Sequence, residues 1–299
     1  MDGLTLGAIY ALVALGYTLV YGVLKLINFA HSEIFMIGTF AALFTLQGLG
    51  VTHPLSGIYL VGVLLLAGLA AAAASGGAAV VLERVAYRPL RRRGASRLAA
   101  LISAIGASFF LQEVFALRYG RDTHSFPRVM NKTVLFHIGD GAVRTDKVVV
   151  IVAALVMMLV LDRFVASTRL GRGIRATAQD PETAVLMGVN IDRVVMVTFL
   201  LGGIMAGGGA LMYGVLLEQT RFDIGFVLGI KAFTAAVLGG IGNLRGALVG
   251  GFLLGLIEAY GSAVWGTQWK DVIAFVVLVV VLMFRPTGLL GEALQRARA

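Results

Sequence analysis

Three stretches of this chain carry no charged residue. Residues 3–24 form an uncharged run of 22 residues, residues 34–82 one of 49, and residues 194–217 one of 24. A helix needs about 20 consecutive apolar residues to span a bilayer. Only 14% of the 299 residues are charged, whereas a soluble domain would carry roughly 25%. The sequence therefore predicts an all-α polytopic membrane protein, folded as a single transmembrane domain over residues 1–299.

The composition also argues against several classes of site. The chain has no cysteine, so neither a disulfide nor a thiolate ligand is available. Its four histidines, at positions 31, 53, 124 and 137, have no spacing typical of metal ligands. We find no nucleophile and base at a plausible spacing, and we therefore expect no catalytic residues, no metal and no enzyme.

We expect a bundle of about eight to nine membrane-spanning helices. The spans lie near residues 3–24, 30–50, 56–82, 98–117, 147–165, 194–217, 229–242, 246–263 and 271–285. The span at 229–242 is the weakest, because it is short, contains Lys231 and ends in the helix-breaking sequence GGIGN. A broken or re-entrant segment here would make Gly240, Gly242 and Asn243 pathway elements, and a simple turn before Arg245 is the alternative.

The distribution of basic residues predicts the orientation. Lys25, segments 84–97 and 163–193 and the tail hold fifteen Lys and Arg, against seven in 118–147 and at Arg221. Basic loops stay in the cytoplasm, so we expect the N-terminus outside, the C-terminus and the 166–193 loop in the cytoplasm, and the 118–147 loop in the periplasm. If 229–242 were re-entrant, the tail would move outside. The net charge of +9 is explained by these loops and requires no nucleic-acid partner.

A short polar helix is predicted inside the 166–193 loop. Asp180 can cap it, Pro181 suits its first position, Glu182 favours the positive end of the dipole, and Gly188 can close it in a left-handed conformation. A helix over 181–187 is too short to persist alone in water. Either it presses against a partner protein, or it rests on the membrane surface.

Polar residues within the spans are candidates for the translocation pathway, because such groups are costly in lipid. Glu258 stands in the middle of a long uncharged run, and an ion pair with Lys231 is an equally good explanation for it. In the sequence INFAHSE, Asn28 can cap the second span, and we place His31 and Glu33 near the cytoplasmic edge, as part of an inner gate. We expect Gln112 and Glu113 to face water outside.

Two segments echo each other. Residues 12–24 (LVALGYTLVYGVL) and 204–216 (IMAGGGALMYGVL) agree at seven of thirteen positions. Five spans lie between them, so the two would run in opposite directions, as in an inverted repeat. Chance similarity between apolar segments is the alternative.

Several ordered blocks resemble the inner-membrane permeases of ABC importers for branched-chain amino acids. They are GAIYALVALGYTLVYGVLKLINFAHSEIFMIGTF, ERVAYRPLR, LISAIGASFFLQ, RATAQDPETAVLMGVNIDRV, KAFTAAVLGGIGNLRGALVGG and RPTGLLG. The resemblance covers nearly the whole chain and is closest to the first of that system's two permease subunits. It implies that the 180–188 helix is a coupling helix, docked on a cytoplasmic ATPase through Arg175, Gln179, Asp180, Pro181, Glu182, Thr183, Leu186, Met187 and Gly188.

The resemblance also implies the partners. They are a second permease subunit forming a heterodimer, two ATPase subunits, a periplasmic substrate-binding protein and the lipid bilayer. The chain has no GxxxxGK[ST] loop, so we expect no cofactor on it and ATP on the partner subunits. The alternatives are another small cargo, such as urea, a short amide or a different neutral amino acid, and an ion-coupled secondary transporter.

Overall fold

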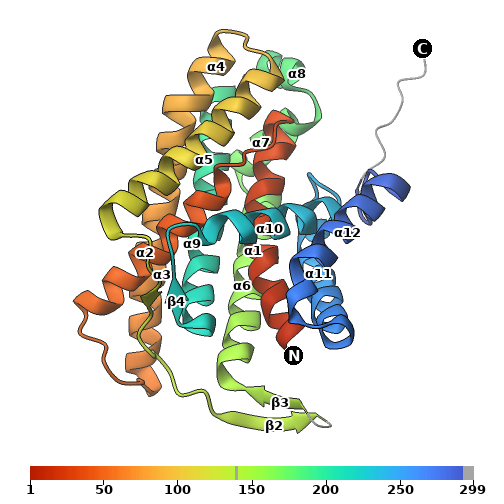
Figure 1. Cartoon of the computed structure of the whole chain (residues 1–299). Helices are drawn as coiled ribbons and strands as arrows, with labels where there is room; N and C mark the ends of the chain where they lie inside the picture. The colour runs from red at the N-terminus through yellow and green to blue at the C-terminus, as the bar shows by residue number, and fades with distance from the viewer. Residues whose placement is uncertain (139–140, 292–299) are drawn as a thin grey trace.

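The computed structural model describes residues 1–138 and 141–291, and within them nine helices occupy the nine predicted spans (Figure 1). They are α1 (Asp2–Leu24), α2 (His31–Gly48), α3 (Gly57–Leu82), α5 (Arg97–Tyr119), α6 (Thr145–Ser167), α9 (Ile191–Leu217), α10 (Ile224–Gly239), α11 (Leu244–Trp265) and α12 (Lys270–Phe284). In the described residues, seven helices are long and apolar enough to cross a membrane. The other two fall outside this set, because α10 has only 16 residues and α2, with 18, begins with the polar residues His31, Ser32 and Glu33.

The connections contain further structure. A π-helix (Glu83–Tyr87) and α4 (Arg88–Arg92) continue α3 without a break, so the prediction that 84–97 is a loop was wrong for most of its length. The segment between α5 and α6 holds β1 (His124–Ser125) and the hairpin of β2 (Val134–Ile138) and β3 (Gly141–Arg144). Strand β1 pairs with β4 (Gln219–Thr220), which follows α9. A 3₁₀ turn (Thr267–Trp269) precedes α12.

Helix α1 forms the centre of the bundle and packs antiparallel to α9 and α11. A Cβ atom added at Gly251 of α11 would lie 2.6 Å from the Cα of Ala11, and one added at Gly7 would lie 2.7 Å from the carbonyl oxygen of Gly251. Small residues let the two backbones approach this closely. The four-residue glycine spacing in α1 and α11 is therefore used for helix contact.

Helix α2 begins deep inside the bundle. Its first residue, His31, packs against Gly16, which lies eight residues before the end of α1 at Leu24, roughly 12 Å at the rise of an α-helix. The segment 25–30 therefore turns back alongside α1 before α2 starts. The first turns of α10 also lie here, because Gly225 and Gly229 both contact Ser32.

The two echoing segments are built alike. Helix α1 is closed by Lys25, with φ +52°, and α9 by Glu218, with φ +56°. These are the non-glycine residues with positive φ in residues 1–138 and 141–291. In both cases the next helix starts six residues later, at His31 or at Ile224. Helices α1 and α9 run in opposite directions, since Leu12 packs on Gly209 while Gly16 packs on Gly202. This arrangement favours the inverted repeat over chance.

The two ends of the bundle differ. Helices α4, α7 and α8 gather at one end, and the N-terminus and the β2–β3 hairpin lie at the other (Figure 1). After α12 the chain returns to the end of α10, where the backbone N–H groups of Leu289 and Leu290 donate to the carbonyls of Leu238 and Gly239. The predicted cytoplasmic tail from residue 292 onward lies outside the described residues.

Candidate functional site

A pair of short helices connects α6 to α9. The first, α7 (Arg169–Gln179), is capped by Thr168, whose hydroxyl accepts from the Gly171 N–H at 2.9 Å. The guanidinium of Arg175 donates to the carbonyl of Val165, which ties α7 to the end of α6. The sequence argument missed α7, although its strong separation of apolar and charged faces was a readable signal.

The second helix, α8 (Pro181–Leu186), has the predicted cap. A carboxylate oxygen of Asp180 accepts from the N–H of Glu182 at 3.0 Å and of Thr183 at 3.3 Å, and its other oxygen accepts from the Thr183 hydroxyl. These bonds, that from the hydroxyl foremost, hold the pKa of the Asp180 carboxyl below its usual value. Gly188 closes the helix with φ +83°.

Helix α8 rests on the protein through one side chain and presents the others to the outside. Ala184 is buried, whereas Val185, Leu186 and Met187 are 54%, 86% and 81% exposed. The Val189 N–H donates to the Ala184 carbonyl at 3.0 Å, and Asn190 then caps α9 by accepting from the Arg193 N–H at 3.0 Å. The helix is thus fixed in orientation and leaves an apolar face without a partner in the described residues.

The nine predicted coupling residues therefore fall on the consecutive helices α7 and α8 and on the residues that cap α8. Arg175 is used internally, and Asp180 and Thr183 form the cap. The side chains of Gln179, Glu182, Leu186 and Met187 are exposed, so they are accessible to a partner protein.

Two predictions about the start of α2 were wrong. Asn28 does not cap the helix, because Ala30 occupies the cap position and the side-chain oxygen of Asn28 accepts from the hydroxyl of Tyr87 at 2.9 Å. His31 and Glu33 do not lie at the edge of the bundle. The turn-back of residues 25–30 carries both inside, where each is at most 1% exposed.

The carboxylate of Glu33 is the centre of a buried polar cluster. Its Oε1 accepts from Ser32 at 3.1 Å, from Ser108 at 3.1 Å and from Gln112 at 2.9 Å. Its Oε2 faces Gly225 at the start of α10 and has no hydrogen-bond partner among the described residues. Gln112 therefore turns inward from α5, against the prediction that it faces outside water. Glu113 is exposed, as predicted, and pairs with Arg121.

The remaining pathway candidates lie on α10 and α11 and in the turn that joins them. Lys231 of α10 and Glu258 of α11 form an ion pair at 2.7 Å, one of the two alternatives drawn from the sequence. Gly240 and Gly242 have φ of +108° and +100° and end α10, and Asn243 caps α11 by accepting from the N–H groups of Arg245 and Gly246. The structure therefore separates the pathway candidates into three groups: the α2 start, the Lys231–Glu258 pair and the 240–243 turn.

Comparison with known proteins identifies the class and then the family. The apolar helices and the permease relatives define a multi-pass protein of the inner membrane. The family described as "Branched-chain amino acid transport system / permease component" matches residues 1–282. The chain belongs to this family.

Two relatives match along almost the whole chain. The high-affinity branched-chain amino acid transport system permease protein BraD of Pseudomonas aeruginosa is 42% identical over 296 residues, covering 98% of this chain and 94% of BraD. The corresponding LivH of Escherichia coli K12 is 42% identical over 295 residues, covering 97% of this chain and 94% of LivH.

Two further matches are weaker. The autoinducer 2 import system permease protein LsrC of Photorhabdus luminescens is 30% identical over 155 residues, covering 48% of this chain and 45% of LsrC. Among solved structures, PsaBC from Streptococcus pneumoniae covers 96% of this chain and 91% of its own at 11% identity and a TM-score of 0.46, a likeness too low to compare individual elements.

Proposed function

We propose that this chain is the membrane-spanning permease subunit of an ABC importer for branched-chain amino acids. BraD and LivH, which match almost the whole chain, are permeases of high-affinity branched-chain amino acid transport systems. The proposed partners are a second permease subunit, two cytoplasmic ATPase subunits and a periplasmic substrate-binding protein. ATP is hydrolysed on the ATPase subunits, because the chain has no phosphate-binding loop.

One observation carries this proposal, the geometry of α8. The helix is capped at both ends, anchored by Ala184 and joined to α9 within a few residues, and it exposes Leu186 and Met187. A free apolar face on a rigidly held helix suits a groove on a partner protein. When the ATPase subunits close on ATP, α8 moves with them and displaces α9, which lies against α1, α2 and α3.

The proposed orientation follows from this docking. The end that carries α4, α7 and α8 faces the cytoplasm, and the N-terminus and the β2–β3 hairpin face the periplasm. The excess of Lys and Arg on the α4 and α7–α8 connections supports this direction.

We place the translocation pathway beside the shared start of α2 and α10. Short helices that begin at depth in the membrane commonly line substrate sites in transporters, where irregular backbone needs protein or water around it. The buried side chains of His31 and Glu33 lie at this point. LsrC, a permease protein of an autoinducer 2 import system, matches 48% of this chain. Because this relative belongs to a system with a different cargo, the uptake experiment includes cargoes other than branched-chain amino acids.

The decisive experiment is ATP-driven uptake in proteoliposomes that contain the complete importer. We expect labelled leucine, isoleucine and valine to enter only with ATP and the binding protein, and urea and autoinducer 2 not to enter. Asp180→Ala combined with Glu182→Lys should leave membrane insertion intact and stop uptake while ATP hydrolysis continues. Normal uptake by this double variant, or uptake by the single chain down a Na⁺ or H⁺ gradient, would refute the proposal.

A further inference from the structure

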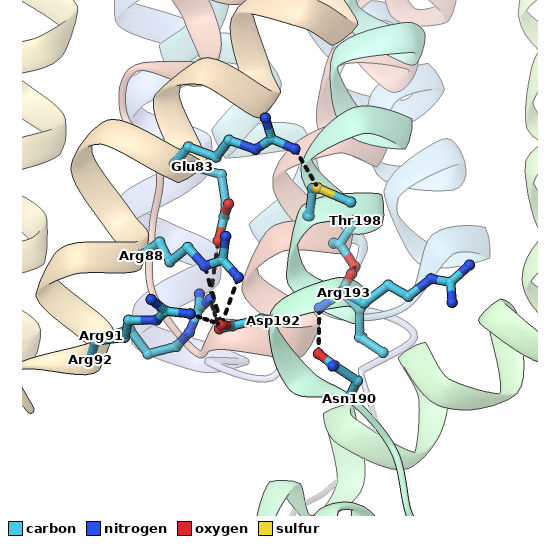
Figure 2. Close-up of polar contacts among 11 residues, drawn as sticks. Glu83, Arg88, Arg91, Arg92, Asn190, Asp192, Arg193 and Thr198 are labelled. Atoms are coloured by element: carbon cyan, nitrogen blue, oxygen red, sulfur yellow. Dashed lines mark hydrogen bonds and ion pairs between the residues drawn. The ribbon is translucent and has the colours of Figure 1, made fainter.

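An ionic cluster joins the beginning of α9 to the end of the long α3–α4 helix. The carboxylate of Asp192, the second residue of α9, accepts hydrogen bonds from three guanidinium groups (Figure 2). Arg91 donates at 2.6 Å, Arg92 at 2.9 Å, and Arg88 through two nitrogens at 2.9 and 3.1 Å. Charge-assisted bonds of this kind are stronger than neutral ones.

Arg91 links Asp192 to a second carboxylate. Its Nη2 lies 3.0 Å from Oε1 of Glu83, whose side chain is 1% exposed. Glu83 begins the π-helix, so the wider turn at this point lies directly between α3 and the arginines of α4. We refer to Glu83, Arg88, Arg91, Arg92 and Asp192 as the Asp192 cluster.

The chain segment that connects α8 to Asp192 is short and held in place by hydrogen bonds. Asp192 lies six residues after the last residue of α8, Leu186. The intervening chain is fixed by the bond from Val189 to Ala184 and by the Asn190 cap. A displacement of α8 therefore reaches Asp192 before it reaches the rest of α9.

Helices α3 and α9 stay in contact farther along α9, away from the Asp192 cluster. A Cβ added at Gly203 would lie 2.6 Å from the carbonyl oxygen of Ser75, and one added at Gly207 would lie 2.5 Å from that of Ala71. The side chains of Leu200 and Ile204 of α9 also pack against Gly76 of α3, so this part of the contact is made by backbone and apolar side chains. The Asp192 cluster supplies a charged link at the end nearest α8.

We propose that the Asp192 cluster transmits the movement of α8 to α3 as well as to α9, with Asp192 as the positioning residue. The ATPase-driven displacement then moves α3–α4 and the start of α9 as one body. Without the carboxylate, α9 moves alone and the bundle does not open. This inference rests on the proposed function.

The test uses the complete importer in proteoliposomes, with uptake and ATP hydrolysis measured together. We expect Asp192→Asn to lower the amount of substrate imported per ATP by about tenfold, within the usual range of a coupling between two sites. Asp192→Glu, which keeps the charge, should restore most of it. Glu113→Gln is the matched control, since it removes a carboxylate that Arg121 contacts at 2.6 Å at the opposite end of the bundle, and it should leave the ratio unchanged.

A second measurement follows the distance between the two sides of the Asp192 cluster, first with Asp192 present and then in Asp192→Asn. The chain has no cysteine, so spin labels can be attached through Ala95→Cys and Arg193→Cys, both at exposed positions. In the importer that retains Asp192, the distance between the two labels should be the same in the nucleotide-free and ATP-bound states. In Asp192→Asn, the distance should differ between these two states.

The outcomes separate the two proposals. If wild-type importer shows no ATP-driven uptake, the proposed function fails. If wild type transports and Asp180→Ala with Glu182→Lys uncouples it, but Asp192→Asn imports as much per ATP as wild type, the inference about Asp192 is wrong. A label distance that changes with nucleotide in a transporting importer that retains Asp192 would also overturn it.

Discussion

The Nζ atom of Lys231 lies 2.7 Å from Oε1 of Glu258, so a cation of α10 and an anion of α11 neutralise each other inside the bundle. The Tyr10 hydroxyl of α1 donates to the other oxygen of Glu258 at 2.9 Å. Lys231 also contacts the carboxylate of Asp271, at 2.8 Å, at the start of α12. Four helices therefore meet at one ion pair.

The two partners of this pair should not be equally costly to remove. Lys231→Met leaves Glu258 buried without a cation, which costs about 3–5 kcal/mol for a broken buried pair. Glu258→Gln leaves Lys231 with Asp271 and should cost less. Thermal unfolding of the purified importer in detergent measures both. Lys231→Met combined with Glu258→Gln should recover part of the loss, and equal melting temperatures for the two single variants would contradict the arrangement.

Helix α8 offers two apolar residues with opposite expected effects. Leu186 is 86% exposed and Ala184 is 3% exposed. Leu186→Asp should leave the melting temperature of the isolated permease unchanged and weaken its binding to the ATPase subunits, because the substitution places a charge on the free face. Ala184→Asp buries an unpaired charge and should destabilise the permease itself. Co-purification and thermal unfolding distinguish the two effects, and loss of stability in Leu186→Asp would show that this face is covered by the chain itself.

The contact between α1 and α11 can be tested at a single glycine. Gly251→Ala places a methyl group 2.6 Å from backbone atoms of Ala11, and overpacking of this kind costs about 1–3 kcal/mol. Gly77 of α3 is the control, since a Cβ there has no neighbour within 4 Å. Gly77→Ala should be neutral or stabilise the helix by about 0.5–1 kcal/mol. If both variants melt at the same temperature, the two helices are farther apart than described.

The loop after α5 should loosen in acid. Burial alone would raise the pKa of the Glu218 carboxyl, but the bonds from Lys132 and Arg128 outweigh it and hold that pKa below its usual value. A lowered pKa means that the carboxylate stabilises the folded loop above the ordinary glutamate pKa of about 4.3, and that this stabilisation is lost as the pH falls through the folded-state pKa.

Hydrogen exchange provides the readout for this pH effect. The Phe126 N–H donates to the backbone carbonyl of Glu218 at 2.8 Å, so its protection should fall at low pH after correction for the intrinsic rate. Glu218→Gln should remove the pH dependence and leave low protection throughout. A protection factor that stays constant in the wild type from neutral pH to acid would contradict the role of Glu218.

Local sequence signals predicted the features that depend only on neighbouring residues, namely the helix positions, the helix caps and the chain break. The apolar runs located nine helices, Asp180 and Gly188 bounded α8, and Asn243 was found where the chain breaks after α10. Each of these features is fixed within a few residues of sequence, by helix periodicity, capping or a positive φ. The missed helix α7 was an omission of the same local kind, because its amphipathic pattern is present in the sequence.

The errors at Gln112 and Asn28 concern contacts between distant segments. Gln112 was placed in outside water, yet it binds Glu33 of α2, 79 residues away. Asn28 was read as a cap, yet its oxygen is bound by Tyr87. In both cases the side chain had a reasonable local role, and only the arrangement of the helices supplied a better partner.

The amino-acid order alone determined that this is a helical membrane protein with a short capped helix between two spans, because run length and cap chemistry act over a turn or two of backbone. The tertiary structure alone decided that α2 and α10 begin beside one another at depth, and that Asp192 lies among three arginines about 100 residues earlier in the chain. Such neighbours arise from close packing of small residues between helices, and no local pattern of polarity records which helices will meet.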